Sequence, residues 1–135
     1  MRPVVAAALL AVLAGCGGRG HSAATTTAAA PKLRVTISAQ SHHPRVGERW
    51  HYEVRVTDAA GKPVAARIHL QILFAGVPVG QIGRHRVANG VWSETFGAPG
   101  NPPFPARARG QHLALQAIAT SNGRTGSAVY PIVVR

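Results

Sequence analysis

Apolar and polar residues alternate along most of the chain after residue 32. Trp50, Tyr52, Val54 and Val56, for example, are separated by polar or charged residues. Side chains of a strand point alternately to its two faces, so a period of two predicts half-buried strands. About seven runs follow this pattern: 33–39, 49–57, 65–74, 79–87, 91–96, 112–120 and 127–134. No window of comparable length has helical spacing, and we therefore predict an all-β domain.

Turn-forming residues lie between these runs. Asn89-Gly90 and Asn122-Gly123 both predict hairpins, because Asn and Gly adopt the positive φ that tight hairpin turns need. The segment 58–63 supplies a third reversal, with Asp58 and Gly61 as turn formers. The fourth run contains Gly80 and is expected to be an edge strand. Short alternating strands joined by regular turns predict a two-sheet sandwich.

The N-terminus has a different pattern. Arg2 is followed by an uncharged apolar stretch over residues 4–14. This length suits the apolar region of a secretory signal, which takes ~7–15 residues. A membrane-spanning helix needs ~20 apolar residues. The segment therefore predicts an export signal and not a permanent transmembrane anchor.

Leu13-Ala14-Gly15-Cys16 closes this apolar stretch. The four residues resemble the lipobox of bacterial lipoproteins. The resemblance implies cleavage before Cys16, attachment of a diacylglyceryl group to its sulfur, and an anchor on the outer face of a membrane. Cys16 is the only cysteine, so no disulfide can form within the chain. The alternative is an ordinary cleaved signal followed by a coincidental cysteine.

These patterns divide the chain into three parts. Residues 1–15 are predicted to be the lipoprotein signal peptide, 16–32 the lipidated cysteine and a linker, and 33–135 one domain. The linker is rich in Ala, Thr and Gly and has no large apolar side chain, so we expect a flexible spacer. The following ~100 residues are a common length for one domain.

Two segments of this domain resemble those of bacterial immunoglobulin-like domains. Val56–Val64 is similar to the reversal between the second and third strands of that superfamily, and Ala119–Gly126 is similar to its last hairpin. The resemblance implies an immunoglobulin-like sandwich. The cysteine pair of antibody domains is absent, and Trp50 lies on the second predicted strand instead of the third. Because this fold hosts many unrelated activities, it leaves the function open.

Residues suited to catalysis are few. The domain has only four acidic residues, Glu48, Glu53, Asp58 and Glu94, and none lies in a catalytic motif. No Gly-x-Ser-x-Gly elbow or phosphate-binding glycine loop occurs. We therefore expect a non-enzymatic protein without a cofactor.

Metal binding is the alternative function. The domain contains six histidines, and imidazole is a common ligand of zinc and copper. His69 and His112 are expected to face outward from the third and sixth strands, which are neighbours in such sandwiches, so they could share a site. No Met-rich run or second cysteine accompanies them.

The chain carries a formal charge of +11. Such an excess attracts polyanions. The arginines are spread over nearly every predicted strand, and Trp50 and Tyr52 have the inward parity, so we do not expect a specific nucleic-acid partner. An envelope protein or an anionic wall polymer is the expected partner.

The loop 97–110 departs from the alternating pattern and contains four prolines. Phe104 within it is a candidate exposed anchor, flanked by the charges of Arg107 and Arg109. In the alternative interpretation, Phe104 folds back and caps one end of the core. Because long loops often carry function, this loop is the predicted contact site. The predicted function is that of a lipid-anchored binding or accessory module of the bacterial envelope.

Overall fold

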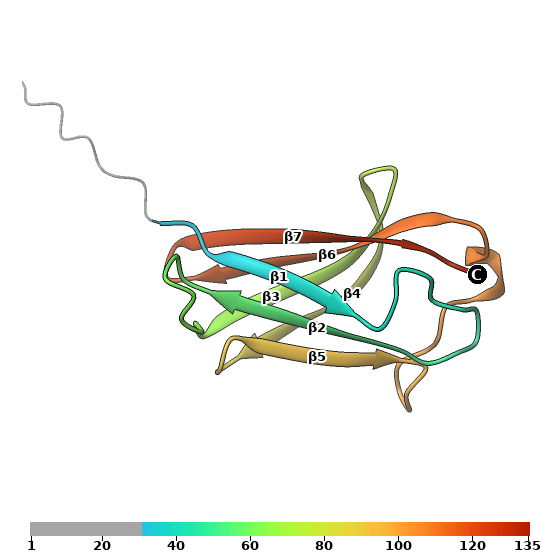
Figure 1. Ribbon diagram of the computed structural model, residues 1–135, viewed down its shortest axis with the longest axis horizontal. Coiled ribbons are helices and arrows are strands. Elements are labelled where there is room, and N and C mark those ends of the chain that lie inside the picture. Colours follow the sequence, from blue (N-terminus) through green and yellow to red (C-terminus); the bar gives the residue numbers. More distant parts are fainter. Residues whose placement is uncertain (1–30) are drawn as a thin grey trace, which may run out of the picture.

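Seven strands in two antiparallel sheets make up the domain, which a computed structural model describes for residues 31–135 (Figure 1). The elements are β1 (Arg34–Ala39), β2 (Trp50–Thr57), β3 (Ala66–Phe74), β4 (Val77–Val87), β5 (Val91–Phe96), a 3-10 helix (Ala106–Ala108), β6 (His112–Ser121) and β7 (Arg124–Val133). The predicted signal peptide, Cys16 and the linker as far as residue 30 lie outside the described residues.

The sheets have the strand orders β1-β2-β5 and β4-β3-β6-β7. The predicted two-sheet sandwich is confirmed, since each predicted run overlaps one strand, although β4 and β7 begin two and three residues before their predicted runs. β4 lies at an edge, as expected for the run that contains Gly80. No helix in the described part of the chain is long and apolar enough to cross a membrane.

The core lies between the sheets and is built from the apolar residues of the alternating runs. From β2, the side chains with the parity of Trp50 and Tyr52 are buried, and Leu70 of β3 and Leu115 of β6 face them from the other sheet. The indole N–H of Trp50 donates to the Ser41 carbonyl oxygen at 2.8 Å, which satisfies its polar atom. Residues 31–135 therefore share one buried apolar cluster between the two sheets.

Two hairpins use residues with positive φ. At the β6–β7 turn, Asn122 and Gly123 have φ of 47° and 73°, which confirms the predicted hairpin. The β3–β4 hairpin turns at Ala75 and Gly76, whose φ angles are 48° and 80°. Alanine is uncommon in this conformation, and the sequence analysis did not identify this turn.

The predicted hairpin at Asn89-Gly90 is wrong. This segment connects β4 to β5, which belong to different sheets. Gly90 has a φ of 68°, and its carbonyl oxygen accepts a hydrogen bond from the Val56 N–H at 2.7 Å. A Cβ at Gly90 would lie 2.5 Å from the Val56 carbonyl oxygen. Glycine is therefore required because the chain passes close to β2 while crossing between sheets.

Candidate functional site

Phe104, the predicted anchor of the 97–110 loop, is buried. Its side chain is 7% exposed and packs edge-on against Trp50, with ring centroids 5.8 Å apart, and against Phe96, at 5.3 Å. The interpretation of Phe104 as an exposed anchor is therefore wrong. The structure instead shows the alternative, in which Phe104 caps one end of the core.

The loop is held against the sandwich at several points. The Asn101 side-chain amide donates to the Thr95 carbonyl oxygen of β5 at 3.1 Å, and the Gly110 N–H donates to that of Val134 at 2.8 Å. Arg107 in the 3-10 helix and Arg109 after it are exposed. That Arg107 and Arg109 contact a partner stays a prediction. Because Phe104 is buried, such a contact would depend on the charges of the two arginines alone.

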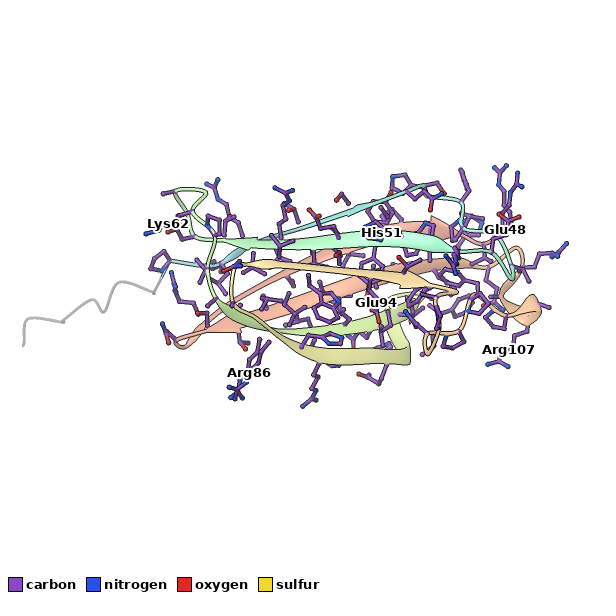
Figure 2. All side chains as sticks on the ribbon, turned by 90° about the horizontal axis from the view of Figure 1, so that it is seen from below. Glu48, His51, Lys62, Arg86, Glu94 and Arg107 are labelled. Atoms are coloured by element: carbon purple, nitrogen blue, oxygen red, sulfur yellow. The ribbon has the colours of Figure 1, made fainter. Side chains whose placement is uncertain are left out.

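The two ends of the sandwich are distinct. At the entry end the chain enters β1, and the 58–65 connection and the Asn122-Gly123 turn lie beside it. At the distal end lie the loops 40–49 and 97–111. Figure 2 shows Lys62 and Arg86 at the entry end, and Glu48 and Arg107 at the distal end. The predicted contact loop is thus far from the point where the N-terminal segment enters.

His69 and His112 do not share a site. His69 pairs with Ile118 of β6, whereas His112 is the first residue of β6, six residues before Ile118. The His69 imidazole forms a hydrogen bond with the Gln81 side chain instead. The prediction of a common metal site for these two histidines is wrong because the register of β3 and β6 separates them. Among residues 31–135, no group of three His, Cys, Asp or Glu side chains is placed to hold a metal ion.

Other histidines have packing partners. His42 stacks on Tyr130 with ring centroids 4.2 Å apart, and its Nδ1 donates to the Pro131 carbonyl oxygen at 2.7 Å. His85 stacks on Trp92 with centroids 3.7 Å apart, at the side where β4 and β5 approach each other. These contacts indicate structural roles for both imidazoles.

A polar pair joins the buried Tyr52 of β2 to the half-buried Glu94 of β5. The Tyr52 hydroxyl is on a fully buried side chain and donates to a Glu94 carboxylate oxygen at 2.5 Å. Burial raises the pKa of Tyr52 far above its ordinary value of 10.0, and the hydrogen bond to Glu94 and its charge raise it further. Tyr52 is therefore a neutral donor to the half-buried Glu94 carboxylate on the edge strand β5.

One cluster of basic residues was not predicted from the sequence. Arg67 of β3 and Arg84 and Arg86 of β4 point outward from the four-stranded sheet, and we call these three residues the arginine face. The spacing of Arg84 and Arg86 could have placed both on one side of a strand. Their position beside Arg67 depends on the β3–β4 register, which follows from the unrecognised turn at Ala75-Gly76.

Together, the strand order and the shared core define an immunoglobulin-like β-sandwich. No family model matches the sequence. No curated protein has a significantly similar sequence. The fold is similar to part of a DUF4785 family protein from Legionella pneumophila, with a TM-score of 0.53 and 9% identity over 76% of this chain. The present chain spans only 28% of that protein.

Two further solved structures are similar at lower scores. The CARDB domain of a Pyrococcus furiosus protein, determined in complex with di-metal ions, has a TM-score of 0.48 and 18% identity, over 78% of this chain and 89% of that one. Titin M4 has a TM-score of 0.48 and 14% identity, over 79% of this chain and 100% of that one.

Proposed function

We propose that this protein is a lipid-anchored, extracytoplasmic binding or accessory module of the bacterial cell envelope. The observation that carries the proposal is Cys16, which directly follows Leu13-Ala14-Gly15 at the end of the apolar N-terminal stretch. The sandwich begins at β1 with Arg34 and has one buried apolar core. In this proposal, the lipid on Cys16 holds the chain on the membrane, and a short linker connects the anchor to the folded domain.

Anchoring by lipid has a simple physical basis. Each buried methylene group contributes ~0.8 kcal/mol, and two acyl chains hold a protein stably on a membrane where one chain is marginal. After Cys16, the sequence supplies a linker of about 15 residues, from Gly17 to Pro31. A flexible linker of this length spans roughly 20 Å. The domain would therefore stay close to the membrane surface.

The distal end is the surface that we propose for partner contact. Arg49, Arg107 and Arg109 are exposed there, and Figure 2 shows Arg107 far from Lys62 at the entry end. An anchored domain presents this end to other envelope components. An anionic wall polymer or an acidic surface of an envelope protein matches its charge.

Substitution of Cys16 tests the anchor. Wild type and Cys16→Ala are expressed in the native cell, and each is followed by antibody through fractionation. We expect wild type in the membrane fraction and Cys16→Ala in the soluble extracytoplasmic fraction or as uncleaved precursor. Membranes are washed at about 1 M salt, which screens ionic contacts beyond ~3 Å and leaves a lipid anchor in place. A Cys16→Ala protein that is cleaved normally and stays on the washed membranes would contradict the proposal.

A further inference from the structure

The arginine face places like charges directly opposite each other. Arg67 of β3 pairs in register with Arg86 of β4, and Arg84 lies opposite His69, one pair further along the same face. All three arginines are exposed. Like charges directly opposite on neighbouring strands are destabilising. The arrangement is unfavourable for the isolated domain and becomes favourable when an anion lies between the guanidinium groups.

None of the domain's four acidic residues neutralises this face. Within residues 31–135, Glu48 forms an ion pair with Arg45, and Glu53 with Arg55. Asp58 accepts hydrogen bonds from the N–H groups of Ala60 and Lys62, while Glu94 accepts from Tyr52. No ion pair involves Arg67, Arg84 or Arg86 among the residues described.

Two neighbouring hollows are lined by these arginines. One, of about 510 Å³, has all three of them together with His69 and Thr120. The other, of about 530 Å³, shares Arg67 and Arg86 and continues along Thr120 to the Asn122-Gly123 turn. Guanidinium groups bind phosphate through paired N–H donors. The surface thus offers adjacent positions for more than one phosphate group.

The arginine face also lies near the entry end of the sandwich, which is joined by the linker to the proposed anchor at Cys16. Arg67 is the second residue of β3 and Arg86 the second-last of β4, so both are at the entry end, where Lys32 precedes β1. Figure 2 shows Arg86 on the side where the described chain begins. A short linker keeps the local concentration of membrane lipid high around this end.

We propose that the arginine face binds the phosphate groups of anionic phospholipids in the membrane that holds the lipid anchor. This inference rests on the proposed anchoring at Cys16 and adds to it a second, electrostatic contact. Basic residues near an anionic leaflet each strengthen membrane binding. The contact orients the sandwich with its entry end on the membrane and its distal end outward.

The test uses a chain without the lipid, so that its outcome does not depend on the anchor. Residues 16–135 carrying Cys16→Ser are mixed with vesicles of phosphatidylcholine, alone or with phosphatidylglycerol, and binding is measured by sedimentation. One variant carries Arg67→Gln, Arg84→Gln and Arg86→Gln. The matched control carries Arg49→Gln, Arg107→Gln and Arg109→Gln, which remove the same charge from the distal end.

We expect the parent chain to bind only the vesicles with phosphatidylglycerol, at about 0.1 M salt, where exposed charges still interact over ~10 Å. The arginine-face variant should lose about tenfold or more in binding, and the control less than threefold. Equal losses in both variants would overturn the proposal, because net charge alone would then explain binding. Binding of inorganic polyphosphate without binding to vesicles would also overturn it.

A single substitution serves as a second test in case the triple variant does not fold. Arg86→Gln alone changes one exposed residue of an edge strand and should lower vesicle binding about threefold or more, with an unchanged melting temperature. Unaltered binding by this folded variant would contradict a contact at Arg86. If Cys16→Ala still releases the protein from cells while these vesicle results fail, the anchor stands and the orientation is wrong.

Discussion

At the scale of single residues, Tyr52 and Glu94 show how the buried face of β2 binds a half-buried carboxylate on the edge strand β5. The fully buried Tyr52 hydroxyl donates to Glu94 at 2.5 Å. Removing the donor leaves that acceptor without its partner, so Tyr52→Phe should lower the free energy of unfolding by about 1–2 kcal/mol. Denaturant unfolding at neutral pH measures this loss.

The same pair predicts a pH dependence. Burial, the largest cause, raises the pKa of Tyr52 above 10.0 in the folded chain. The unfolded chain releases this proton above about pH 10 while the folded chain retains it, so the stabilisation is complete below that pH and declines as pH rises. Between about pH 9 and pH 11, wild type should lose roughly 1 kcal/mol more unfolding free energy than Tyr52→Phe. Parallel curves would contradict a raised Tyr52 pKa.

For Phe104, the structure decides between the two interpretations of the sequence in favour of the core cap. Its ring packs against Trp50 and Phe96 and is 7% exposed. Phe104→Ala should therefore lower the unfolding free energy by about 3–5 kcal/mol, as in other buried aromatic truncations. Arg107→Ala, an exposed change in the same loop, should cost less than about 0.5 kcal/mol. Thermal unfolding that responds equally weakly to both variants would argue against the capping role.

At the scale of elements, the two hairpins of the four-stranded sheet form a matched pair. Both turn residues of each have positive φ, but one turn is Ala75-Gly76 and the other Asn122-Gly123. Asn tolerates this conformation better than Ala. Ala75→Asn should raise the unfolding free energy by about 0.5–1 kcal/mol, and Asn122→Ala should lower it by a similar amount. Chemical denaturation checks both, and changes of the same sign would contradict the account.

The elements differ in how far the sequence predicts them. Alternation placed Trp50 and Tyr52 inward correctly, because burial on one face repeats every second residue. Local turn chemistry was less reliable: Asn89-Gly90 connects two sheets, while Ala75-Gly76 makes a hairpin without a strong turn signal. The arginine face could not be predicted, since it requires the register between β3 and β4. Strand order and register depend on packing across the whole domain.

At the scale of the whole molecule, the sandwich has basic residues at both ends, and we propose a different binding function for each end. The entry end carries Arg67 and Arg86 beside two hollows, and it is where the N-terminal segment arrives. The distal end carries Arg107 and Arg109 on a loop fastened to the core by Phe104. Exposed loops, by contrast with the core, tolerate change and commonly carry contacts. We therefore expect partner contacts at the distal end and membrane contacts at the entry end.

Lipid anchoring through Cys16 is best tested by the intact mass of the mature protein, purified in detergent from the native membrane. We expect a chain that begins at Cys16 and carries the additional mass of a diacylglyceryl group, with fragmentation locating the addition on that residue. A mature chain that begins at another residue, or that begins at Cys16 with an unmodified thiol, would contradict lipid anchoring through Cys16.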